Sequence, residues 1–449
     1  MRLLQSELHI CTLHLKSKLL RTFVTILILL LAWPAIYRGV RTFLADRIFR
    51  GEQTVESYSR AILYDPANAV LWWNRGRLQH YSLSGVDIPK AIQDYEKALA
   101  LNRRLSQAWV DLADCYEKTG RYAEAEAALE NAFSTHTYSP LIRWQAGNFF
   151  LRRGNLPRMY ECLKLAGEFD IEKLVPAIEL SWKADPDHLG ILEKLVPDNL
   201  PANLRYLQFL AGRDELDLAR PVWSRVKKND IPEAMEYRVS QVFAYIDRLL
   251  VHGRIEEAHG VWMDALQKAG EGMTGTPFGS KASMTQRQAE NLVWNGSFEN
   301  EILQGGFDWR FPEIEEVEFR IDLSERMEGL KSLKLTFKGA NISFAHLSQI
   351  VPILTPGKYQ LDYFLRTEGL TTDKAPYFFI QGYPGVEAES FQTDPFPAST
   401  PWRKAAIVFA AKEGCKAVQL ILRRDFSSKF DNQINGSLWL DGISIHAID

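Results

Sequence analysis

The chain has 449 residues, in which 53 Lys and Arg nearly balance 56 Asp and Glu, so that the formal net charge is −3. This balance argues against a general polyanion binder, and nucleic acid is therefore not an expected partner. The four cysteines are widely spaced and form neither a CxxC pair nor a zinc-ligand pattern. The length allows two or three structural units.

The first 50 residues are basic and contain an uncharged apolar stretch, Thr22–Tyr37. As a helix it would span roughly 24 Å at about 1.5 Å per residue, somewhat less than a hydrocarbon core of about 30 Å. Flanking Lys and Arg side chains can extend the usable length by reaching towards the headgroups. We therefore expect one membrane-spanning helix at about residues 20–40, which makes the protein a single-pass membrane protein.

Two alternatives for this stretch are a buried hairpin helix and a cleaved signal peptide. A buried helix should carry a polar stripe, but the stretch offers only threonines. A cleavage site of the A-x-A kind is absent, which favours an uncleaved anchor. Basic residues flank both ends almost equally, so the positive-inside rule does not select a topology.

Residues 51–269 carry a helical repeat that is clearest at Ser106–Ala132, where apolar and small residues recur at helical spacing on both sides of Gly120. The residues on the two facing sides are Trp109, Leu112, Ala113, Tyr116, Ala125, Leu129 and Ala132. This order resembles the tetratricopeptide repeat, a helical hairpin of about 34 residues. Gly120 and Gly154 lie 34 positions apart, which matches that period. We expect five to six hairpins, with irregular ones at 170–230, where prolines interrupt the pattern.

One such hairpin cannot bury both its faces, so the repeats must stack on one another. The resemblance implies a concave face that binds a protein partner, and polar residues of the first helices are the candidates for it: Asn74, Arg77, Asp111, Asp114, Gln145 and Asn148. The alternative for each of these residues is ordinary solvation. The tryptophans of the repeats are expected to be core residues.

Residues 270–287 are rich in Gly, Ser and Thr without an apolar period, which predicts a linker. Residues 288–449 then contain several short runs of β-branched and aromatic residues separated by turn residues, which predicts an antiparallel β-sandwich. The opening Asn291–Glu299, the closing Leu438–Ile445 and the segment Gly306–Arg310 resemble the jelly roll of carbohydrate-binding modules, which is similar to galactose-binding-like domains. The predicted fold class is thus multidomain α + β, with a transmembrane helix, an α-solenoid and a C-terminal jelly roll.

This second resemblance implies a site for sugar, in which aromatic rings stack on pyranose faces and polar groups bond the hydroxyls. The candidates are Trp309, Tyr383, Trp402, Arg366, Arg423 and Asp425, while Trp439, in an alternating strand, is expected in the core. For each aromatic, core packing is the alternative. Such modules often hold a structural calcium ion, and Glu299 and Asp441 match its positions; solvation of Glu299 and a turn cap at Asp441 are the alternative. No cofactor is otherwise required.

Catalysis is not expected, because the sequence lacks a nucleophile elbow, a P-loop, an HExxH motif and a Rossmann glycine pattern. Glu315, Glu316 and Glu318 do not by themselves make a glycosidase pair. The leading hypothesis is a non-catalytic, membrane-anchored scaffold, similar to proteins of cell-surface polysaccharide assembly or export, with its bulk in the periplasm or otherwise outside the cytoplasm. A pure protein–protein adaptor with a structural sandwich is the alternative, and a polysaccharide hydrolase comes third.

Overall fold

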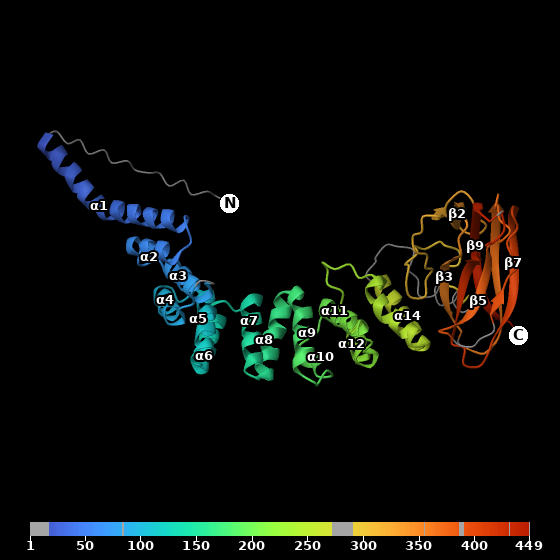
Figure 1. Cartoon of the computed structure of the whole chain (residues 1–449), viewed down its shortest axis with the longest axis horizontal. Coiled ribbons are helices and arrows are strands. Elements are labelled where there is room, and N and C mark those ends of the chain that lie inside the picture. Colours follow the sequence, from blue (N-terminus) through green and yellow to red (C-terminus); the bar gives the residue numbers. More distant parts are fainter. Residues whose placement is uncertain are drawn as a thin grey trace, which may run out of the picture. The chain divides into compact units, whose positions relative to one another are not determined.

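The computed structural model describes residues 18–82, 85–271, 291–353, 355–385, 390–430 and 432–448. It forms two compact units, Met1–Lys173 and Leu174–Asp449, which are described here one after the other (Figure 1). The predicted fold class is confirmed, since helical repeats precede an antiparallel β-sandwich.

The first unit is helical, and its helices, the first included, pack in pairs as successive hairpins. The helix before Gly120 ends at Lys118 and the helix after it begins at Tyr122, as predicted for the clearest repeat. Small residues allow the close packing within a hairpin, since a Cβ added to Gly147 would lie 2.6 Å from Leu163. The elements are α1 (Lys18–Phe49), α2 (Val55–Tyr64), α3 (Ala69–Tyr81), α4 (Ile88–Leu101), α5 (Ser106–Lys118), α6 (Tyr122–Thr135), α7 (Pro140–Arg152), α8 (Leu156–Phe169) and the 3₁₀ helix η1 (Ile171–Lys173).

Helix α1 is long and apolar enough, by length and composition, to cross a membrane or to serve as a signal sequence. Pro34 lies inside it, where the ring removes one backbone hydrogen bond, and the ribbon bends along its length (Figure 1). The last part of α1 packs on the next helix. Ala45, Ile48 and Phe49 pack against α2, around Tyr58, so one continuous helix begins as an apolar segment and ends as the first helix of the first hairpin.

The helices of the second unit are shorter and less regular, as the prolines of this region predict. Pro201 is the second residue of one of them, and Pro221 lies inside another. The elements are α9 (Leu174–Ala184), α10 (Ile191–Lys194), α11 (Leu200–Ala211), α12 (Leu216–Lys228), the 3₁₀ helix η2 (Val239–Val242), α13 (Phe243–Val251) and α14 (Ile255–Glu271). Helix α14 thus takes in the first residues of the predicted linker at 270–287, and the rest of that linker lies outside the described residues.

The sandwich consists of two antiparallel sheets, β1-β2-β9-β4-β7 and β3-β8-β5-β6. The predicted opening and closing segments lie side by side, because Leu292 N–H donates to Ile445 O (2.9 Å) and Ile443 N–H donates to Gly296 O (2.9 Å). The strands are β1 (Val317–Asp322), β2 (Ser332–Ala340), β3 (Phe344–Pro352), β4 (Gly357–Glu368), β5 (Tyr377–Tyr383), β6 (Phe391–Gln392), β7 (Thr400–Ala411), β8 (Ala417–Arg424) and β9 (Ile434–Ile448).

The sandwich packs directly on the hairpin α13–α14 within the second unit. Trp262 of α14 is 1% exposed, and its ring lies 5.6 Å from that of Trp294 and 6.3 Å from that of Phe307. Gly305 and Gly306 make this contact possible, since an added Cβ would lie 2.3 Å from Phe243 and 2.6 Å from Trp262, respectively.

Two ion pairs surround this aromatic cluster. Arg310 Nη2 lies 2.5 Å from Asp247 Oδ1 of α13, and Lys416 of the sandwich pairs with Glu256 of α14. The hairpin and the sandwich therefore share one apolar interface with a charged rim, in addition to their covalent connection.

Candidate functional site

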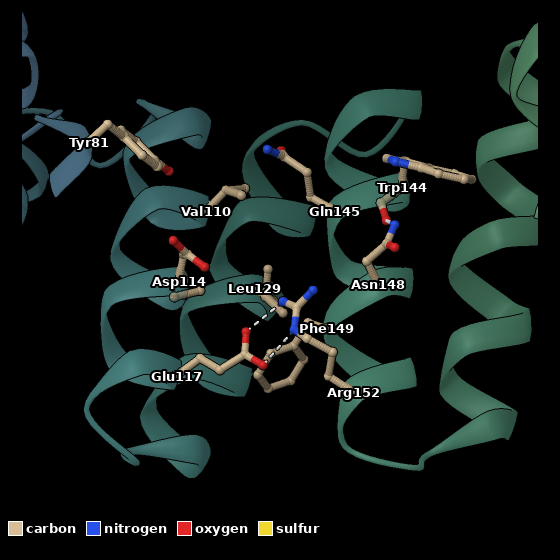
Figure 2. A pocket seen from close by; sticks show the side chains of 11 residues that line it. Tyr81, Val110, Asp114, Glu117, Leu129, Trp144, Gln145, Asn148, Phe149 and Arg152 are labelled. Atoms are coloured by element: carbon tan, nitrogen blue, oxygen red, sulfur yellow. Dashed lines mark hydrogen bonds and ion pairs between the residues drawn. The ribbon is translucent and has the colours of Figure 1, made fainter. Parts of the chain in front are cut away.

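A hollow of about 260 Å³ lies in the first unit along α5 and α7 (Figure 2). It is lined by three of the residues predicted for the concave face, Asp114, Gln145 and Asn148. The other lining residues are Tyr81, Val110, Ala113, Glu117, Leu129, Trp144, Phe149 and Arg152. We call this feature the repeat groove. It has an apolar floor and polar walls.

A buried carboxylate, Asp111 on α5, lies behind the groove residue Tyr81 without lining the repeat groove itself. Trp73 Nε1–H donates to its Oδ2 (2.7 Å), and Tyr81 O–H donates to its Oδ1 (3.3 Å). Arg77 Nε lies 3.8 Å from Oδ2. Burial raises the pKa of Asp111, against the opposing effects of Trp73 and Arg77. The hydrogen bonds fix the Tyr81 ring at the edge of the hollow.

A second carboxylate, that of Asp114, does line the repeat groove. His80 Nε2 and Lys118 Nζ each lie 2.8 Å from its Oδ2. Burial acts to raise the pKa of Asp114, but the hydrogen bonds from His80 and Lys118 outweigh it and hold the pKa at about 2. The Lys118 ammonium also lies 5.4 Å from the Tyr81 ring centre, so negative and positive charge are offered side by side.

The opposite wall comes from α7 and contains a hydrogen-bond acceptor without a donor. Gln145 Oε1 is buried and accepts no hydrogen bond from any residue that the structure describes. Asn148 Nδ2 donates to Trp144 O of its own helix (2.8 Å). Glu117 and Arg152 close the end of the groove with a two-point pair of 2.6 and 2.8 Å (Figure 2). A buried acceptor without a donor is costly, and a bound N–H group would satisfy it.

The predicted docking residues therefore gather on the first helices of successive hairpins, α3, α5 and α7. Three of the six, Asn74, Arg77 and Asp111, do not line the groove. Asn74 Nδ2 donates to Val70 O of its own helix (2.8 Å). Sequence reasoning missed Tyr81, Glu117 and Arg152. Spacing could have suggested them, because each follows a predicted residue at about one helical turn (Arg77, Asp114 and Asn148).

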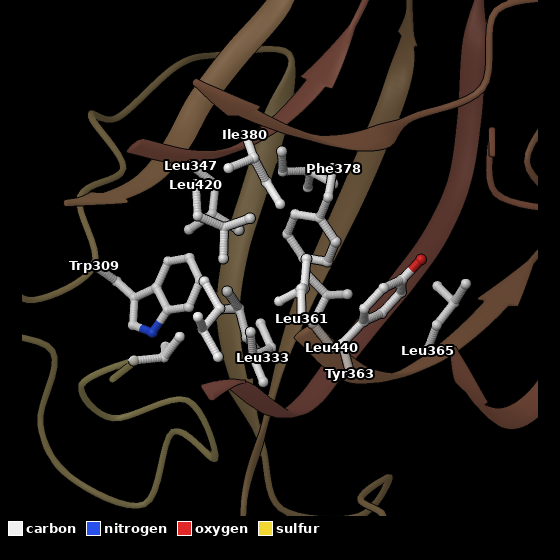
Figure 3. Packing of buried hydrophobic residues seen from close by; sticks show 14 of the residues in the cluster. Trp309, Leu333, Leu347, Leu361, Tyr363, Leu365, Phe378, Ile380, Leu420 and Leu440 are labelled. Atoms are coloured by element: carbon white, nitrogen blue, oxygen red, sulfur yellow. The ribbon is translucent and has the colours of Figure 1, made fainter. Parts of the chain in front are cut away.

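The predicted sugar-binding residues do not form one site. Trp309, predicted as a stacking platform, is fully buried in the core between the sheets (Figure 3). Its Nε1–H donates to Asn295 O (3.2 Å), and its ring lies 5.5 Å from that of Phe298. The prediction for Trp309 is wrong, because the apolar ring fills the sandwich interior and no sugar can reach it.

Arg366 on β4 and Trp402 on β7 belong to the five-stranded sheet. Arg366 forms a cross-strand row with Trp439 on β9 and Lys334 on β2. The two cations lie 4.9 and 4.6 Å from the Trp439 ring, and Trp439 Nε1–H donates to Asp322 Oδ2 (3.0 Å). Trp439 is buried as expected, but beneath charged side chains and not in the cluster between the sheets.

Trp402 is half-buried on the edge strand β7, and its Nε1–H is buried without an acceptor among the described residues. We call Arg366, Trp439, Lys334 and Trp402 the sheet face. It offers one half-exposed aromatic ring and several charged groups, which together could contact a sugar or a second protein.

The other predicted residues lie on the four-stranded sheet. Arg423 Nε donates to Asp425 Oδ1 (3.1 Å), and Tyr377 O–H donates to Asp425 Oδ2 (2.9 Å). Tyr383 ends β5 beside the hairpin α13–α14, where Pro384 approaches Gly253. Burial raises the pKa of Tyr383, with a smaller effect from Arg310 in the opposite direction.

The predicted calcium ligands both hold the loop between β1 and β2. Glu299 Oε1 accepts the N–H groups of Leu330 (2.6 Å) and Lys331 (2.9 Å). Asp441 Oδ2 accepts those of Met327 and Glu328 (both 2.8 Å). Over the described ranges, no three His, Cys, Asp or Glu side chains are placed to hold a metal ion. Calcium binding by this pair stays a prediction, and it would compete with these N–H donors.

The acidic residues considered for hydrolysis do not face a described cavity. Glu315 and Glu316 are exposed in the turn before β1, and Glu318 is exposed on β1 itself. None of the three lines the repeat groove.

Comparison with known proteins matches residues 87–137 to the tetratricopeptide repeat family. The solved structures similar to the chain include YrrB, a tetratricopeptide protein with an unusual peptide-binding site, at 17% identity over 52% of this chain and 100% of that chain, with a TM-score of 0.23. They also include a family 16 carbohydrate-binding module, at 19% identity over 34% and 99% of the two chains, with a TM-score of 0.26.

A xylan-binding domain from Paenibacillus barcinonensis is similar at 17% identity over 36% of this chain and 97% of that chain, with a TM-score of 0.24. No curated protein matches the sequence. Residues 87–137 are thus a tetratricopeptide-repeat segment, in a chain of helical repeats that ends in a β-sandwich with carbohydrate-binding modules among its structural neighbours.

Proposed function

We propose that the protein is a non-catalytic scaffold, anchored to a membrane by α1, whose repeat groove docks a protein partner. The observation that carries this proposal is the buried and unpartnered Gln145 Oε1 in a hollow with an apolar floor. An extended peptide supplies what the hollow lacks, since its backbone N–H can donate to Gln145 while one apolar side chain covers Val110, Leu129 and Phe149. The surrounding charges of Asp114, Lys118, Glu117 and Arg152 would select its flanking residues.

A peptide-binding measurement tests this proposal. Peptides are first selected from a displayed library against the full chain in detergent. Their affinity should fall at least about tenfold when Gln145 or Trp144 is changed to alanine. A tenfold change corresponds to about 1.4 kcal/mol, which is within the range of a lost buried hydrogen bond or aromatic contact. Tyr138→Ala, which removes an exposed aromatic outside the groove, is the control. Equal affinity for all four proteins would place the site elsewhere.

For the C-terminal domain we propose contact with a glycan or a second protein through the sheet face. Trp402 supports a glycan, because it is a half-exposed ring on β7, the strand that pairs with β4 and its Arg366. The dispersal of the other predicted sugar residues supports the second candidate, a pure protein adaptor whose sandwich is structural. The proposed setting is cell-surface polysaccharide assembly or export.

Affinity electrophoresis separates these two candidates. In gels that contain an acidic or a neutral polysaccharide, we expect retardation of the full chain, and its loss in Trp402→Ala because the stacking ring is gone. Arg423→Ala, on the other sheet, serves as the matched control. Migration that no polysaccharide changes would favour the adaptor.

The proposed topology places residues 51–449 outside the cytoplasm, where a glycan-binding domain has access to its ligand. Added protease should therefore degrade this part of the chain in intact spheroplasts. Full protection until the membrane is permeabilised would assign the bulk of the chain to the cytoplasm and would leave an exported-glycan role without support.

A further inference from the structure

The C-terminal end of α2 is tied to α1 by Arg41. The Arg41 guanidinium donates to Leu63 O (2.7 Å) and Tyr64 O (2.8 Å). The last turn of α2 has no basic residue of its own, so Arg41 supplies the positive charge that stabilises a helix C-terminus. The same guanidinium lies 5.5 Å from the ring centre of Tyr37.

These contacts fix the end of α2 close to the apolar part of α1. Arg41 follows Tyr37, the last residue of the uncharged stretch, by four positions, which is about 6 Å along a helix. The packing of Tyr58 against the end of α1 and the bonds to Arg41 show that α2 runs back along α1 towards this stretch. The end of α2 therefore lies about one helical turn from the border of the candidate span.

Four of the five residues at that end, Leu63–Ala67, are apolar or aromatic and exposed, and the acidic Asp65 between them is half-buried. Leu63 is 75% exposed and Tyr64 is 40% exposed, although each follows a buried turn of the same helix. Pro66 and Ala67 are exposed in the turn that follows. On α1, Val40, the residue directly before Arg41, is 53% exposed.

We propose that the end of the first hairpin, Leu63–Ala67, inserts into the interfacial layer of the lipid bilayer that α1 crosses. This inference rests on the proposed anchoring by α1 and adds a second membrane contact. The bilayer is the occupant because the surface is continuous with the span and lies within one helical turn of its border. A tyrosine ring with a polar tip suits the headgroup level, and arginines at this depth meet anionic headgroups.

Power-saturation spectroscopy of nitroxide labels measures this depth directly. The full chain carries Cys11→Ser, and its three other cysteines are buried, so a single added cysteine takes the label. The label is placed at Leu63→Cys, and the protein is measured in vesicles of phosphatidylethanolamine and phosphatidylglycerol. Leu29→Cys, within the span, and Tyr138→Cys, on an exposed loop, are the references. The quantity measured is accessibility to oxygen relative to a water-soluble nickel complex.

We expect this ratio to be high at Leu29, low at Tyr138 and intermediate at Leu63. We also expect Arg41→Ala to lower the ratio at Leu63 towards the value of Tyr138, because the end of α2 is then released. A ratio at Leu63 equal to that at Tyr138, with Leu29 still in the bilayer, overturns the inference and leaves the anchor intact. An aqueous value at Leu29 overturns the anchor and the inference together.

Discussion

Trp262→Ala is expected to release the β-sandwich from the last helical hairpin. Trp262 is 1% exposed and packs on Trp294, Phe307 and Phe243, so alanine leaves a large cavity at the interface. Removal of a buried tryptophan typically costs about 3–5 kcal/mol. Gly305 and Gly306 shape the loop to the indole, and the loop cannot refill the space without a shift of the backbone.

The release can be seen after cleavage of the chain. A specific protease site introduced between residues 272 and 290 allows the two parts to be separated covalently. After cleavage we expect the parts to co-elute in gel filtration for the otherwise unchanged chain and to elute apart for Trp262→Ala. Trp223→Ala is the matched control, because Trp223 is also buried but lies in α12. Co-elution of the cleaved Trp262→Ala chain would contradict the importance of this contact.

The second large effect concerns where a soluble version of the chain begins. A chain that begins at Arg38 keeps Arg41, Ala45, Ile48 and Phe49, whereas one that begins at Gly51 loses all of them. Their loss uncovers Tyr58 and the rest of the small core at α2. Because two large apolar side chains and two hydrogen bonds disappear, we expect the first hairpin to lose about 3–5 kcal/mol of local stability.

Hydrogen exchange of the α2 amides measures this loss. In the chain from Arg38 the amides near Tyr58 should be protected nearly as well as those of α5, and in the chain from Gly51 they should exchange with little protection. Phe43→Ala in the longer chain is the control, because Phe43 lies on the same helix but is 63% exposed. Equal protection of α2 in both chains would show that α1 adds nothing to the hairpin.

Much of the fold could be predicted because its signals are periodic. The spacing around Gly120 and Gly154, and the short β-branched runs after residue 330, report local geometry that tertiary packing leaves unchanged. The same holds for the repeat groove. Polar residues on successive first helices, such as Asp114, Gln145 and Asn148, must share a face when hairpins stack, and they do.

The sugar site could not be predicted in the same way, because an aromatic residue in a β-sandwich looks the same in sequence whether it points inward or outward. Trp309 lies in an irregular segment without alternation, and only the fold shows that it fills the core. Trp439 lies in an alternating strand, but it is covered by the neighbouring Lys334 and Arg366 instead of the opposite sheet. Such cover depends on strand pairing between distant segments.

The packing of the end of α1 on α2 could not be predicted from hydropathy either. Hydropathy marks where an apolar stretch ends but not where the helix ends, and the helix continues from Tyr37 to Phe49. Ala45, Ile48 and Phe49 look unremarkable beside the strongly apolar residues before them, although they pack on α2.

With the proposed anchoring, this continuity makes α1 an unbroken helical connection between the bilayer and the first hairpin. Any rotation of the apolar segment of α1 about its own axis turns α2 with it, because no loop separates this segment from the part of α1 that packs on α2. One residue inserted between Tyr37 and Arg41 would turn the first hairpin by about 100° relative to the span and move it about 1.5 Å further from the membrane. The number of residues in this short segment, more than their identity, therefore sets the direction in which the first hairpin faces.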